Sequence, residues 1–159
     1  MTLRYGKNDT RDLLAKSRRD WERLARAEAG GDDEAMGDAL MDLSVTLTSL
    51  KDWLGKRAVS GASFSKDDVA AFLKSSVPLS SFRDIANELK HGAPGRDSET
   101  SDVLTSAPSS YVGSTPPKSG RPQPRLKITR KDGSRHRAID LARNAVEDLE
   151  GFMRKHALI

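Results

Sequence analysis

One short segment of this chain carries most of the side chains whose types could do chemistry. If residues 82–91 form a helix, Asp84, Asn87 and His91 fall within one narrow arc at about 100° per residue, and Arg83 and Lys90 flank that arc. The opposite side of this helix is apolar, with Phe82, Ile85, Ala86 and Leu89. The polar side would therefore present a carboxylate, an amide, an imidazole and two cations to whatever faces it.

These groups match the needs of RNA cleavage by the RNA's own 2′-hydroxyl. That reaction needs a proton donor and a proton acceptor near neutral pH, and histidine has an unperturbed pKa of about 6.5. We predict His91 as general acid or base, Arg83 or Lys90 as the cation that stabilises the phosphorane, and Asn87 as the group that orients the phosphate or the imidazole. Helix-end chemistry offers another interpretation, since cations followed by Gly92 are typical of a helix C-terminus.

Other classes of chemistry are excluded or disfavoured. The chain has no cysteine, which excludes disulfides, thiolate zinc sites and cysteine nucleophiles, and it has only 3 histidines. It also lacks Gly-rich phosphate loops and the signatures of zinc proteases and serine hydrolases. We therefore expect no metal and no cofactor.

The charge of the chain is unevenly distributed. Its 27 basic and 23 acidic residues sum to +4, but residues 118–137 hold eight bases and one acid, or +7, so the rest of the chain sums to −3. Such a segment is typical of an arm that tracks phosphates, although a solvated loop with a polar hairpin face would look the same. The residues predicted to bind nucleic acid are Lys90, Lys118, Arg121, Arg125, Lys127, Arg130, Lys131, Arg135 and Arg137.

Hydrophobic periodicity predicts a mainly α-helical fold of about five helices. Apolar residues recur at three- and four-residue steps over 10–29 and 32–56, and the Gly30–Gly31 turn between these segments favours an antiparallel pair. Shorter helices are expected over 67–74, where Ser65 provides the cap, and over 82–91, where Ser80 or Ser81 begins the helix after Pro78. Asp140 is the predicted cap of a final helix.

A long loop and a β-hairpin are expected between the fourth helix and the last. Ten of the 23 residues over 97–119 are Ser or Thr, and prolines punctuate the stretch, so we expect a mobile or functional loop over 93–123. Asp132–Gly133 between two extended segments predicts a hairpin with a two- or three-residue loop. At 159 residues the whole chain, 1–159, is expected to form a single domain.

The segment 83–92, followed by a variable loop, a Lys-Asp-Gly hairpin and a helix beginning Ala-Ile-Asp-Leu-Ala, resembles small prokaryotic and phage proteins of the HEPN-like class. The resemblance implies a dimeric helical bundle, and many members are metal-independent ribonucleases of toxin–antitoxin and abortive-infection systems. It implies catalytic roles for Arg83 and His91. Seven residues separate these two here, whereas the family motif has four to six.

Two functions are therefore open. The first is a metal-independent endoribonuclease that uses Arg83, Asn87 and His91. The second is a non-catalytic module that pairs with itself, an antitoxin or another protein, or binds RNA through the basic arm at 118–137. No apolar run approaches the ~20 residues that span a bilayer, so we expect a cytoplasmic protein without membrane contact.

Overall fold

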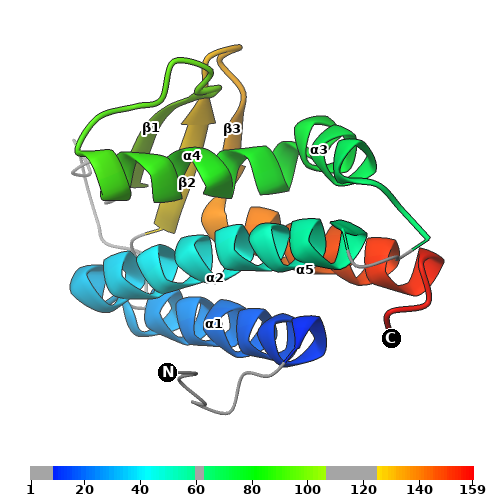
Figure 1. Cartoon of the computed structure of the whole chain (residues 1–159). Coiled ribbons are helices and arrows are strands. Elements are labelled where there is room, and N and C mark those ends of the chain that lie inside the picture. Colours follow the sequence, from blue (N-terminus) through cyan, green and yellow to red (C-terminus); the bar gives the residue numbers. More distant parts are fainter. Residues whose placement is uncertain (1–8, 60–62, 107–124) are drawn as a thin grey trace, which may run out of the picture.

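The computed structural model of the chain describes residues 9–59, 63–106 and 125–159 (Figure 1). The helices of this part are α1 (Thr10–Gly30), α2 (Asp33–Val59), α3 (Lys66–Ser75), α4 (Val77–His91) and α5 (Ala138–Lys155). The strands are β1 (Thr100–Ser106), β2 (Arg125–Arg130) and β3 (Arg135–Arg137). None of the described helices is long and apolar enough to cross a bilayer.

The first two helices form the expected antiparallel pair. The Asp9 side chain begins α1 by accepting hydrogen bonds from the backbone N–H groups of Arg11 and Asp12, at 2.8 and 3.1 Å. Gly31 ends it with a left-handed φ of 67°, which a residue without a Cβ adopts freely. The chain then reverses, and α2 runs back along α1 (Figure 1).

The start of α4 differs from the predicted one. Ser76, and neither Ser80 nor Ser81, is the N-cap, and its hydroxyl accepts from the Leu79 N–H at 3.2 Å. Pro78 lies in the first turn, where its missing N–H would have had no helical partner. The helix is therefore longer at its start than the sequence pattern predicted, and it ends at the predicted Gly92, which has φ 67°.

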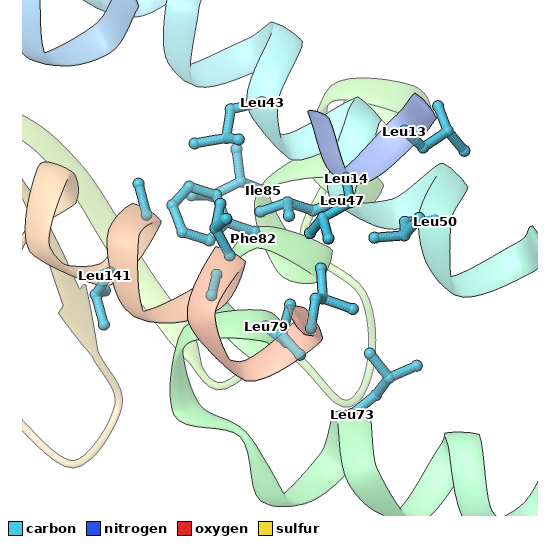
Figure 2. Packing of buried hydrophobic residues seen from close by; sticks show 14 of the residues in the cluster. Leu13, Leu14, Leu43, Leu47, Leu50, Leu73, Leu79, Phe82, Ile85 and Leu141 are labelled. Atoms are coloured by element: carbon cyan, nitrogen blue, oxygen red, sulfur yellow. The ribbon is translucent and has the colours of Figure 1, made fainter. Parts of the chain in front are cut away.

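The core lies where α4 packs onto α2, with α5 on the other side. Figure 2 shows Phe82 and Ile85 of α4 beside Leu43 and Leu47 of α2, and Phe82 and Leu43 are fully buried. The spacing of Phe82 and Ile85, three residues apart, puts both on the same face of the helix. This face fixes the rotation of α4, so its polar side points away from α2.

The three strands form one antiparallel sheet in the order β1-β2-β3. β2 and β3 are the predicted hairpin, but β1 lies within the stretch 93–123, which was expected to be a loop. That prediction was wrong for residues 100–106, because Thr and Val in this stretch pair with β2 and extend the sheet. The rest of the expected loop, from 107 onwards, lies outside the described residues.

The hairpin has a three-residue loop, which decides between the two- and three-residue loops that the sequence allowed. Arg130 and Ser134 close it, since the Arg130 N–H donates to the Ser134 carbonyl at 2.9 Å. Within the loop, the Gly133 N–H donates to the Arg130 carbonyl at 2.9 Å, and Gly133 has φ 83°. A tight turn followed by a left-handed glycine is a common three-residue hairpin connection.

The last helix, α5, packs against the first, α1. α5 begins at Ala138, after Arg137, so Asp140 lies in its first turn and is not its cap. Trp21 of α1 donates its indole N–H to the Ile139 carbonyl at 3.1 Å, and the Arg11 Nε donates to the Leu158 carbonyl at 2.8 Å. The two ends of the described chain are thus held side by side.

The predicted fold class is confirmed. The described chain is mainly helical, with five helices and a small antiparallel sheet before the C-terminal helix. The sheet has one strand more than the expected hairpin.

Candidate nucleic-acid interface

Asp84, the carboxylate of the predicted polar arc, is a buried structural group. Its side chain is 3% exposed and lies in the middle of α4. One oxygen, Oδ2, accepts from the backbone N–H groups of Glu99 and Thr100 at 2.8 and 3.1 Å. Asp84 therefore fastens the beginning of β1 to α4, and the strand that it holds is what covers it.

Arg83 is turned toward this carboxylate. Its Nη2 and Nε donate to Asp84 Oδ1 at 2.9 and 3.3 Å, and its side chain is 30% exposed. It also lines a small cavity between α2, α3 and α4, together with Lys51 and Leu73. The guanidinium thus neutralises the buried Asp84 and lies among packed helices.

His91 and Lys90 are exposed in the last turn of α4, and Asn87 is half-buried one turn earlier. Because α4 is continuous from Val77 to His91, the eight-residue step from Arg83 to His91 spans about 12 Å along the axis. A single phosphate bound by both side chains would have to bridge this distance. The structure therefore does not bring Arg83 and His91 together within one chain.

The basic stretch is divided by the two faces of the sheet. Partners in an antiparallel ladder share a face, and alternate residues of a strand face opposite ways. Ile128 is fully buried and pairs with Val103 and His136, so these three point toward the helices. Thr129 pairs with Asp102 and Arg135, so these residues point toward solvent.

Arg130 lies on the inner face and is used inside the fold. Its Nη1 donates to the hydroxyls of Ser81 and Ser80 at 2.8 and 3.1 Å and to the Val77 carbonyl at 3.3 Å. These partners belong to the first turns of α4, whose serines are buried. Although it was predicted to bind nucleic acid, Arg130 joins the hairpin to α4.

Arg137 pairs with Lys127 in the ladder and so shares its face of the sheet, but it is also occupied. Its Nη2 donates to Glu28 Oε1 at 2.5 Å, and the other oxygen of Glu28 accepts from the Leu126 N–H at 3.4 Å. This hydrogen bond to Glu28 raises the pKa of Arg137 above its usual value. The pair connects the end of α1 to the sheet and to the start of α5.

We call three of the cations on the solvent side, Lys127, Lys131 and Arg135, the basic face. Lys127 lies two residues before Thr129 and so shares its outward direction, while Lys131 is exposed at the hairpin loop. In the described part of the chain none of the three forms an ion pair. Arg125 is exposed on the same side of β2, and Asp102 is the acid on this side of β1. Lys118 and Arg121 lie outside the described residues.

Hydrogen bonds hold the hairpin loop and the backbone of Lys131. The Lys131 N–H donates to the Glu99 carbonyl at 2.8 Å, and Asp132 Oδ1 accepts from the Ser134 N–H at 2.8 Å. The hydrogen bonds from Ser134 lower the pKa of Asp132, so its charge stays beside the cations at neutral pH. The loop is thus a fixed edge of the basic face.

The roles of Glu28 and Asp84 were not predicted from the sequence. For Glu28 a signal existed, because it continues the apolar stripe of α1 at the next helical step after Leu24, and a charge on such a stripe requires a buried partner. For Asp84 no local signal existed, since its partners arrive from a strand more than 14 residues later. Within the described residues no group of three or more His, Asp or Glu side chains could hold a metal.

Comparison with known proteins adds no relative: no protein-family model, no curated protein and no solved structure matches the chain. The resemblance to HEPN-like proteins therefore stays a prediction.

Proposed function

We propose that this protein is a nucleic-acid-binding module that contacts phosphates through its basic face. The observation that carries the proposal is that the fold divides the basic stretch into cations with internal partners and cations without an ion pair. Arg130 and Arg137 are used inside the fold, whereas Lys127, Lys131 and Arg135 are directed to solvent without an ion pair in the described chain. A fold that holds unpaired cations on a rigid sheet offers a preformed surface for an anionic backbone.

The expected binding is electrostatic and independent of sequence. The outward residues that the structure describes on the sheet, Asp102, Lys127, Thr129 and Arg135 among them, are not aromatic, so these residues offer no base stacking. Each phosphate that is neutralised releases counterions, which makes the affinity fall as salt rises. Three contacts predict about a 20-fold loss on single strands and about a 40-fold loss on duplex DNA between about 50 and 200 mM salt.

The test is a salt titration of binding by fluorescence anisotropy, with a uridine homopolymer and a DNA duplex as probes. The triple variant Lys127→Ala/Lys131→Ala/Arg135→Ala should lose most of the affinity and most of the salt dependence. A matched variant, Arg19→Ala/Arg26→Ala/Lys74→Ala, removes three exposed cations from the helices and changes the net charge equally. Equal losses in the two variants would show a general charge effect and would contradict the proposal.

A ribonuclease is the second candidate, and the exposure of Lys90 and His91 together at the open end of α4 favours it. Since Arg83 of the same chain is about 12 Å away along the helix, the phosphate-stabilising cation would be Lys90 or a group from a second copy. The wild-type protein and His91→Ala should be incubated with RNA without added metal. Cleavage that disappears in His91→Ala supports this function, and binding without cleavage supports the module.

A further inference from the structure

An apolar groove lies on the side of the molecule away from α3. It has a volume of about 660 Å³, and its walls come from α2, α4 and β1. In Figure 1 these walls are the left ends of α2 and α4, with β1 behind. Its apolar lining consists of Leu40, Met41, Ile85, Leu89, Val103 and Leu126.

Two of these side chains are exposed without a partner element. Met41 of α2 and Leu89 of α4 are 44% and 42% exposed, and they border a floor of buried Leu40, Ile85 and Leu126. Exposed aliphatic groups that rim a hollow with an apolar floor are typical of a docking surface. A bound aliphatic side chain would cover both of them.

The third wall is an open sheet edge. β1 is an outer strand of the sheet and pairs with β2 alone in the described chain. Four consecutive residues of its start, 100–103, line the groove, so the groove follows the backbone edge of the strand and not merely one face of it. The Thr100 N–H donates to Asp84 Oδ2 and the Thr100 carbonyl accepts from the Ser98 hydroxyl. The edge from residue 101 onwards therefore offers N–H and C=O groups to an extended partner.

The ionisable side chains that line the groove all carry negative charge. Its ionisable lining residues are Glu88 on α4 and Asp102 on β1, both exposed and both acidic. Glu34, also exposed, lies one turn before Gly37 on the same side of α2. No cation belongs to the lining, in contrast to the basic face.

We propose that this groove binds an extended segment of another protein that adds a strand to β1 and in which aliphatic residues alternate with Lys or Arg. The alternation follows from the pleat. An added strand continues both faces of the sheet, so one set of its side chains enters the groove beside Leu89, and the other set lies beside Asp102 on the solvent side. The proposal does not depend on nucleic-acid binding.

The probe is a synthetic peptide of alternating valine and lysine, compared with one of alternating valine and glutamate. The lysine peptide should bind at least about tenfold more tightly, because like charges would face Asp102 in the other complex and the acidic lining of the groove would repel the glutamate peptide as a whole. Two further lysine peptides carry N-methyl groups on all valines or on all lysines. Since alternate N–H groups of a strand point to the same side, one of these two should lose about tenfold and the other should retain its affinity.

Protein variants locate the site. Leu89→Glu should weaken the lysine peptide about tenfold, by replacing apolar contact with a buried charge. Val77→Glu is the matched control, because Val77 is also on α4 and is also 42% exposed, but it does not line the groove. Amide shifts in the NMR spectrum of the bound protein should concentrate at residues 100–103.

Several results would overturn the proposal. They are equal binding of the lysine and glutamate peptides, insensitivity to both N-methylated sets, and equal effects of the two protein variants. A dimer in solution that Leu89→Glu converts to a monomer would show that a second copy, and not a foreign strand, occupies the groove.

Discussion

Replacing Asp84 with alanine should destabilise the protein by about 3 kcal/mol, a magnitude that follows from its hydrogen bonds. The carboxylate accepts from the Glu99 and Thr100 N–H groups, and Arg83 donates to its other oxygen. Each backbone bond to the buried, charged acceptor contributes about 1 kcal/mol or somewhat more, and the 30%-exposed Arg83 adds less than 1 kcal/mol.

The variant Asp84→Asn separates the contribution of the two backbone hydrogen bonds from that of the charge. An asparagine retains one acceptor oxygen of the same size for the two backbone N–H groups, but it loses the charge that Arg83 faces. We therefore expect a loss of about 1 kcal/mol, well below that of the alanine variant. Asp38→Ala, at an exposed site on α2, should change stability by less than about 0.5 kcal/mol.

Urea denaturation followed by helical circular dichroism measures these differences. Hydrogen exchange adds a local readout, because the Glu99 and Thr100 amides should exchange much faster in Asp84→Ala, while amides in α1 change only as far as global stability does. The reasoning is refuted if the alanine variant loses less than 1 kcal/mol. It is equally refuted if the asparagine variant is as unstable as the alanine variant.

Three further predictions concern stability. Glu28→Ala should cost about 2 kcal/mol in urea denaturation, because it leaves Arg137 and a backbone N–H without their buried acceptor, and a loss below 0.5 kcal/mol would contradict this. Gly133→Ala should lower the melting temperature through about 1 kcal/mol of strain at φ 83°, whereas Gly151→Ala, in the open surface of α5, should raise it. Arg154 and Arg18 lower the pKa of Glu150, so its contribution is present at neutral pH and is lost as the pH falls below about 4; Glu150→Gln should flatten this part of the stability–pH curve.

Periodicity and end signals predicted the helices because both are local. The step between Leu13, Leu14 and Leu24 identified the buried side of α1, and Gly31 and Gly92 marked two helix ends at their left-handed residues. The start of α4 was misplaced because Pro78 is compatible with either a connection or a first helical turn. Sequence pattern alone does not distinguish the two.

The candidate site depended more on distant contacts. Helical spacing correctly places Asp84 and His91 on the polar side of α4, but it cannot show that β1 returns to cover one and leaves the other exposed. Likewise, alternation in β2 separates Arg130 from Lys127, yet only the packing of α4 shows which of them is inside. A chain segment far along the sequence thus decided which charges remain available.

The pairing of the first and last helices bears on how the protein is made. The Arg11–Leu158 hydrogen bond joins residues 147 positions apart, and Trp21 of α1 donates a hydrogen bond to Ile139 of α5. During synthesis α1 and α2 can pair early through local contacts, but the side of α1 that meets α5 stays uncovered until α5 has emerged. The fold is therefore completed only after α5 has been synthesised, and a chain truncated before α5 should leave this side of α1 exposed.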